Sequence, residues 1–71
     1  MTKQIDATTW AVEVSPLMHV TYANVRRVIT RIPEREIGGK VGDFGWRMLR
    51  RERERDGKKG CWWILRKVQG E

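Results

Sequence analysis

The fold of this chain depends on one stretch in its C-terminal half, Asp43-Phe44-Gly45-Trp46-Arg47-Met48-Leu49-Arg50-Arg51-Glu52-Arg53-Glu54-Arg55-Asp56-Gly57. Asp43 is a good helix N-cap, and Gly57 is a good helix stop. The run of arginine and glutamate has a higher intrinsic propensity for helix than for strand. We therefore expect a helix over residues 44–56. A strand over residues 46–55, paired with residues 61–68, is the competing interpretation.

The residues after this stretch predict a turn and a strand. Gly57-Lys58-Lys59-Gly60 has the composition of a turn, and Cys61–Val68 is rich in aromatic and branched residues. Neighbouring side chains on a strand face opposite sides, so only one of Trp62 and Trp63 can fill a core. The other is then available to stack on a base or to pack against a partner.

The clearest periodicity lies between Pro16 and Ile32. Apolar residues recur there at alternating spacings of four and three, at Met18, Tyr22, Val25, Ile29 and Ile32. This spacing predicts an amphipathic helix, which Pro33 ends, and Thr21 is an alternative, later N-cap. A short, marginal helix can follow from Pro33, with Gly42 as its left-handed C-terminal cap.

The N-terminal segment, Ile5–Val14, allows two interpretations. Asp6 could cap a short helix, whereas the alternation of Trp10, Val12 and Val14 is equally typical of a strand. We favour the helix. The whole pattern then predicts an α+β, mainly α fold with two to three helices and a short C-terminal β element, in a single domain over residues 1–71.

Charge gives the first indication of function. The chain has 15 Lys and Arg residues against nine Asp and Glu residues, a net charge of +6. The segment from Trp46 to Lys67 contains nine basic and three acidic residues, so it accounts for the whole surplus. A one-sided basic face interleaved with aromatic residues is the electrostatic footprint of a polyanion binder. Nucleic acid is therefore the first partner to consider.

Several classes of function are excluded by composition. A chain of 71 residues buries only about 60% of its unfolded surface, which leaves little room for an enclosed active site. His19 and Cys61 are the single residues of their types, whereas zinc sites need clustered ligands and a nucleophile needs a nearby base. We expect no enzyme, no metal and no cofactor. No apolar run approaches the roughly 20 residues of a membrane span, and a lone cysteine fits a reducing compartment, so we expect a cytoplasmic protein without a membrane partner.

A family resemblance rests on Ile37-Gly38-Gly39-Lys40-Val41-Gly42 followed by a capped basic helix. This order resembles the helix-turn-helix pattern, and the basic turn with the strand Cys61–Val68 resembles the wing of winged helix-turn-helix DNA-binding domains. The size and layout are similar to those of small phage and mobile-element regulators, including excisionase-type factors. The resemblance covers roughly residues 20–68.

The chain also departs from that pattern. Asp43 stands where the turn usually carries an apolar residue, and Gly39 adds a second glycine. Arg51 or Glu52 falls where the recognition helix usually has its last core residue.

The resemblance implies a small, basic transcription or recombination accessory regulator that binds double-stranded DNA. The helix over residues 44–56 would enter the major groove, beside a basic wing around residues 57–60. An arginine of that helix could pair bidentately with guanine. A homodimer would fit this function, because paired half-sites compensate for a small footprint, and the protein would associate with the nucleoid. The implied DNA-contacting residues are Arg47, Arg50, Arg51, Lys58, Lys59, Arg26, Arg27, Lys40 and Arg66.

Two other functions compete with DNA binding. The protein could be a phage-type inhibitor or adaptor that docks its basic, tryptophan-bearing face on an acidic partner surface. RNA or single-stranded nucleic acid is the third candidate, favoured if Trp62 or Trp63 is exposed on a sheet face. The structural alternative for the Arg/Glu run is a solvated helix face.

Overall fold

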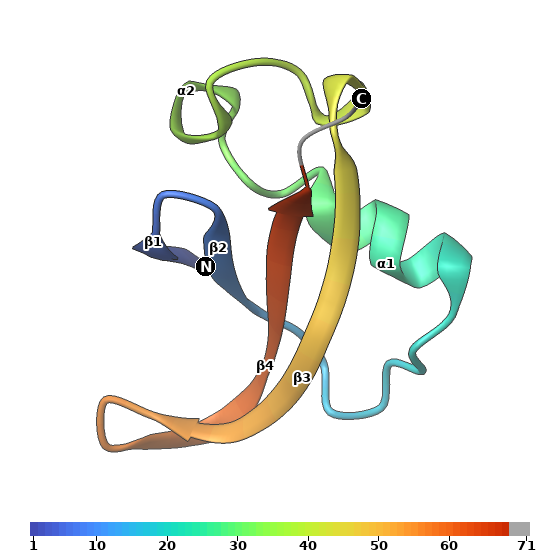
Figure 1. The fold of residues 1–71 in the computed structure, drawn as a ribbon. Coiled ribbons are helices and arrows are strands. Elements are labelled where there is room, and N and C mark those ends of the chain that lie inside the picture. The colour runs from blue at the N-terminus through green and yellow to red at the C-terminus, as the bar shows by residue number, and fades with distance from the viewer. Residues whose placement is uncertain (69–71) are drawn as a thin grey trace.

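The structure, a computed structural model, describes residues 1–68 and is built around one antiparallel sheet (Figure 1). The strands are β1 (Thr2–Asp6), β2 (Thr9–Glu13), β3 (Gly45–Arg55) and β4 (Lys58–Val68). Helix α1 (Tyr22–Ile29), helix α2 (Glu34–Ile37) and the 3-10 turn η1 (Val41–Asp43) connect β2 to β3. The expectation of a mainly α fold is wrong, because most of the ordered backbone is strand. Residues 69–71 of the expected single domain lie outside the described residues.

The strands are ordered β1-β2-β4-β3, so β1 and β3 form the two edges. Strands β3 and β4 make a long, curved hairpin, and the short strands β1 and β2 lie along one side of it (Figure 1). The register of the hairpin shifts between Met48 and Arg50 and again between Glu52 and Glu54. Such bulges bend a strand and increase its twist, which gives the hairpin its curvature.

The predicted helix over residues 44–56 is instead mostly strand β3, so the expected recognition helix does not exist. Trp46 and Met48 alternate with Arg47, and both pack against the core. The turn that follows has two residues, Asp56 at φ 51° and Gly57 at φ 77°. Two positive φ angles in succession match the twist of a β-hairpin, and Asp-Gly is a strong signal for this turn. Lys58 therefore already belongs to β4, and the expected turn over residues 57–60 is wrong as well.

The favoured helix in the N-terminal segment is also wrong. Residues 2–13 form the β1–β2 hairpin, as the alternation of Trp10, Val12 and Val14 indicated in the competing interpretation. Trp10 lies opposite Leu65 on β4, and Val12 lies opposite Trp63. These pairs place the alternating side chains of β2 and β4 on the same face of the sheet.

Helix α1 is shorter than the predicted span from Pro16 to Ile32. The Thr21 hydroxyl accepts a hydrogen bond from the backbone N–H of Asn24, so the later N-cap is the correct one. Helix α2 has four residues and ends at Gly38, whose φ of 80° makes it the left-handed cap in place of Gly42. Asp43, expected to cap a helix, accepts a hydrogen bond from the Lys40 backbone N–H within η1.

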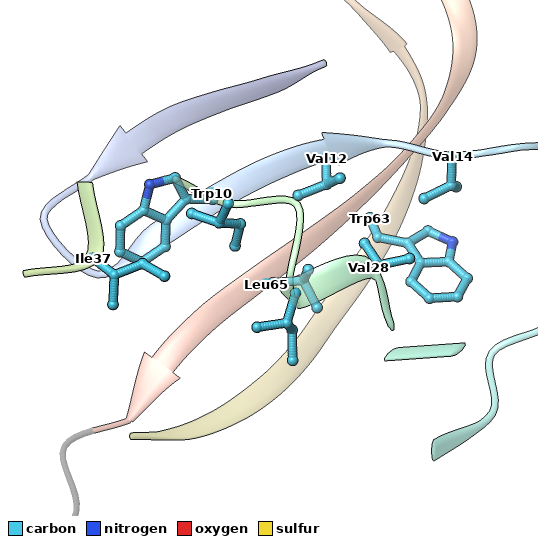
Figure 2. Packing of buried hydrophobic residues seen from close by; sticks show 9 residues of the cluster. Trp10, Val12, Val14, Val28, Ile37, Trp63 and Leu65 are labelled. Atoms are coloured by element: carbon cyan, nitrogen blue, oxygen red, sulfur yellow. The ribbon is translucent and has the colours of Figure 1, made fainter. Parts of the chain in front are cut away.

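The hydrophobic core lies between the helices and one face of the sheet. Its members, all buried, are Trp10, Val12, Val14, Val28, Ile29, Ile32, Ile37, Trp63 and Leu65. The two indoles occupy opposite ends of this cluster, Trp10 beside Ile37 and Trp63 beside Val14 and Val28 (Figure 2). Each large apolar side chain buried in this way stabilises the fold by about 1.5–3 kcal/mol. Helix α1 contains several β-branched residues, so it depends on packing against the sheet rather than on its own helix propensity.

The second face of the sheet carries no helix, and we call it the open face. It includes Ala11 and Ile64, which are nevertheless 1% and 0% exposed. A small cavity of about 100 Å³ beside Ala11 is lined by Met1, Trp62 and Arg55, among others.

Candidate nucleic-acid interface

The β3–β4 hairpin extends beyond the rest of the sheet. Strand β2 pairs with β4 only from Glu13–Trp62 to Thr9–Arg66. Residues 53–60, which we call the ribbon end, are therefore a two-stranded ribbon that pairs with no third strand within residues 1–68 (Figure 1). Lys3 of the N-terminal strand contacts this ribbon end, and its Nζ lies 2.8 Å from Asp56 Oδ2.

Two of the three acidic side chains of the hairpin, Glu52 and Asp56, are engaged by neighbouring cations. Glu52 accepts a hydrogen bond from Arg55 Nη1 at 2.6 Å and another from Arg50 Nε at 2.9 Å. Both hydrogen bonds lower the pKa of Glu52, and the bond from Arg55 has the larger effect. The hydrogen bond from Lys3 likewise lowers the pKa of Asp56. Both carboxylates therefore stay ionised and paired at neutral pH.

Six exposed hairpin cations have no ion pair within residues 1–68. They are Arg47, Arg51, Arg53, Lys58, Lys59 and Arg66. Five of them are among the predicted DNA-contacting residues, and Arg53 was not among those predicted. The hairpin thus presents unneutralised positive charge along its length.

The three arginines expected on one helix face are divided between the two faces of the sheet. Arg47 lies opposite Arg66, and Arg50 lies opposite Ile64, so these side chains belong to the open face. Arg51 lies opposite Trp63 and belongs to the helix-covered face. It lines a cavity of about 180 Å³ together with Arg53.

Lys58 and Lys59 lie opposite Arg55 and Glu54 at the start of β4. They are brought together with Arg53 on the ribbon end. Both lysines lie on strand β4, directly after the Asp56-Gly57 turn, rather than in the turn where the sequence placed them.

The two tryptophans of β4 occupy different environments, as their adjacent positions on a strand predicted. Trp63 is fully buried in the core and is unavailable for stacking. Trp62 is half-buried on the open face, with its ring against Gly60, where a Cβ atom would come within 2.8 Å of the indole. Of the two candidates for stacking, only Trp62 reaches the surface.

The remaining predicted residues lie on the helical side of the molecule. Arg26 and Arg27 are exposed on α1, and the Arg26 guanidinium donates a hydrogen bond to the Tyr22 hydroxyl at 3.2 Å. Lys40 is the exposed N-cap residue of η1. These three cations therefore lie outside the hairpin. Arg26 and Arg27 line a separate groove, which is described below.

Sequence reasoning missed the contribution of Lys3 and the pairing of Arg55. No local pattern predicts that Lys3 meets a residue 53 positions away, because the contact requires the curved hairpin to be formed. The pairing of Arg55 with Glu52 three positions before it occurs here on a strand. Lys67, the last cation of the basic segment, is structural, since its ammonium donates to the Ile37 carbonyl and lies 4.5 Å from the centre of the Phe44 ring.

Within residues 1–68, no group of three or more His, Cys, Asp or Glu side chains is placed to hold a metal ion. The helices of the same part of the chain are all too short and polar to cross a membrane. No protein-family model, curated protein or solved structure matches this chain.

Proposed function

We propose that this protein binds double-stranded DNA through the β3–β4 hairpin. The main support for this proposal is the location of the positive charge. The hairpin holds the entire net charge of the chain, and two of its three acidic residues, Glu52 and Asp56, are already paired with cations. The exposed cations that remain are free to neutralise phosphates.

The shape of the ribbon end supports duplex DNA as the partner. A two-stranded antiparallel ribbon fits the major groove of B-DNA, which is about 12 Å wide. In this arrangement Arg53, Lys58 and Lys59 would approach the duplex first, and Arg47 and Arg66 would contact phosphates further along the hairpin. Contacts to phosphate orient a protein on DNA, whereas an arginine that reaches a guanine edge adds sequence preference.

Protection of a sheet edge is the structural alternative for these charges. Edge strands often carry charged side chains, which prevent pairing with other chains, and β3 is an edge strand. That explanation does not extend to Arg66, because β4 is paired on both sides at this position. Edge protection therefore accounts for only part of the positive charge.

The direct test is a titration of intrinsic tryptophan fluorescence with random-sequence duplex DNA at several salt concentrations. Six phosphate contacts predict that log K falls with log salt at a slope of about −5. The absence of saturable binding at low salt would overturn the proposal.

A matched pair of variants separates an oriented contact from the effect of net charge. Lys59→Glu changes the ribbon end, whereas Arg35→Glu changes an exposed position on α2 and alters the net charge equally. We expect Lys59→Glu to weaken binding at least tenfold more than Arg35→Glu. Equal losses would show that the protein attracts DNA through its overall charge alone.

A further inference from the structure

Strand β3 leaves one side of its backbone unpaired within residues 1–68. It is the last strand of the sheet, and its only strand partner is β4. None of the backbone hydrogen bonds that residues 45–55 make in this part of the chain reaches an element other than β4. An open edge of this kind is a template on which another chain can add a strand.

A groove of about 680 Å³ lies between helix α1 and the beginning of that open edge. The helix contributes Tyr22, Val25 and Ile29 to the lining, and the segment leading into β3 contributes Phe44 and Trp46. A helix beside an unpaired strand edge is the geometry in which extended peptides bind by strand addition, with their side chains received in an adjoining pocket.

The groove has an apolar floor that is ready to receive a side chain. Val25, Phe44 and Trp46 are half-buried and pack against the core cluster from the side of the groove. The Trp46 indole is held in position by its hydrogen bond to the Val41 carbonyl at 3.1 Å. At the mouth of the groove, the Tyr22 side chain is 77% exposed and is flanked by the Arg26 guanidinium.

Charge determines the kind of chain that fits. Among residues 1–68, the charged residues in the lining are Arg26 and Arg27, and none of the lining residues is acidic. Beyond the groove, β3 carries five arginines against two glutamates. A carboxylate on an added strand would therefore meet cations both at the groove and along β3, and opposite charges on adjacent strands stabilise pairing by roughly 0.2–1 kcal/mol each. A second copy of β3 would instead bring arginines together.

We propose that the edge of β3 binds an extended acidic segment of a partner protein, which adds as a fifth strand and places an apolar side chain in the groove beside α1. The groove beside α1 lies apart from the ribbon end, whereas the edge of β3 shares Arg47 and Arg53 with the proposed DNA-binding surface. Peptide binding at this edge does not depend on DNA binding.

The test uses a synthetic ten-residue peptide in which glutamate alternates with valine and one central valine is replaced by phenylalanine. Two control peptides keep the length. One replaces every glutamate by lysine, and the other carries N-methyl groups on alternate backbone nitrogens, which removes the hydrogen bonds of strand addition. Binding is followed by amide and indole NMR shifts of the ¹⁵N-labelled full chain, together with amide hydrogen exchange.

The proposal expects the glutamate peptide to shift the amides of Gly45, Trp46 and Arg47 and the Trp46 indole, and to slow hydrogen exchange at amides on the free side of β3. Each control peptide should bind at least tenfold more weakly. Equal binding of the lysine peptide would overturn the charge argument, and equal binding of the N-methylated peptide would overturn strand addition. A short DNA duplex that shifts the Trp46 indole as strongly as the peptide does, and not only the amide of Arg47, would assign the groove to nucleic acid and overturn the proposal.

Variants test the cation rim without changing the floor of the groove. The double variant Arg26→Gln and Arg27→Gln keeps polar, helix-compatible side chains on α1, and its folding is checked by circular dichroism. We expect at least a tenfold loss of peptide affinity, with Arg35→Gln as the control that loses none. Lys59→Glu should weaken DNA binding and leave peptide binding within twofold, so the two proposals fail separately. Unchanged peptide affinity in the double variant would overturn the assigned role of the arginines.

Discussion

Lys3 and Asp56 join the first strand of the protein to the turn of its long hairpin. Their ammonium and carboxylate groups are 2.8 Å apart, although 53 positions separate them in the sequence. Both side chains are more than half exposed, so water screens the attraction, and the pair contributes little to stability. Its larger consequence is electrostatic, because it removes one cation and one anion from the charge that the ribbon end presents.

Replacing Asp56 should strengthen DNA binding while leaving the fold intact. Asp56→Asn keeps a residue that tolerates the positive φ of this position and frees Lys3 for a phosphate. We expect tighter binding to duplex DNA and a salt slope steeper by about one contact. Salt-dependent fluorescence titration measures both quantities. Weaker binding would show that the ion pair itself holds the ribbon end in its DNA-binding position.

The two buried tryptophans should respond differently to replacement by phenylalanine. Trp10 Nε1 donates to Glu36 Oε1 at 3.1 Å, whereas Trp63 Nε1 is buried and has no hydrogen-bond partner within residues 1–68. Both substitutions remove a similar volume from the core. Trp10→Phe also strands a half-buried carboxylate, so we expect it to cost about 1 kcal/mol more in the free energy of unfolding than Trp63→Phe.

Urea unfolding of the two variants measures that difference, and a double-mutant cycle assigns its cause. Combining Trp10→Phe with Glu36→Ala should recover part of the extra cost, since the carboxylate is then absent. A larger loss of unfolding free energy for Trp63→Phe than for Trp10→Phe would contradict the role assigned to the hydrogen bond between Trp10 and Glu36.

Alanine at Gly57 or Gly38 should destabilise the protein through the backbone alone. Their φ angles are 77° and 80°, and a Cβ atom at either position meets no heavy atom within 4 Å. The left-handed conformation costs an alanine roughly 1–2 kcal/mol. Gly42→Ala is the matched control, because Gly42 has the same open space without a positive φ. Thermal unfolding should therefore give Gly42→Ala a clearly higher melting temperature than the other two variants. Equal melting temperatures for the three variants would refute the backbone explanation.

The Glu52 carboxylate should make the stability of the hairpin depend on pH in the acid range. Its pKa in the folded protein lies below the ordinary glutamate value of 4.5, chiefly because of the hydrogen bond from Arg55. A lowered folded pKa means that the unfolded chain binds the proton more readily, so the stabilisation is present above about pH 4.5 and is lost as the pH falls below it. Glu52→Gln should show a shallower loss of stability between pH 5 and pH 3. Identical pH profiles for Glu52→Gln and the unsubstituted protein would show that Glu52 does not cause this pH dependence.

Local signals in the sequence predicted some elements of the fold correctly. The spacing of Tyr22, Val25 and Ile29 predicted α1, and the aromatic and branched residues from Cys61 to Val68 predicted the main part of β4. The opposite orientations of Trp62 and Trp63 also followed from strand geometry alone, since alternation needs no knowledge of the partner strands. The concentration of charge between Trp46 and Lys67 was likewise evident, and it underlies the proposed function.

The error over residues 44–56 shows where local propensity fails. Helix preferences of arginine and glutamate amount to a few tenths of a kcal/mol per residue, whereas pairing with β4 packs the half-buried side chains of Met48 and Trp46 against the core. The Asp56-Gly57 dipeptide was the signal that could have corrected the prediction, because it favours a two-residue hairpin turn more specifically than it favours the end of a helix.

The sequence by itself therefore determined the amount and location of the charge, the amphipathic helix α1 and the alternation within β4, all of which depend on neighbouring residues. Tertiary structure alone decided that residues 45–55 are a strand, that Arg47 and Arg51 lie on opposite faces, that Lys3 meets Asp56, and that β3 has an open edge beside α1. The physical reason is that each of these features requires segments distant in the chain to be packed together, and the free energy gained in that packing exceeds the small local preferences of the separate segments.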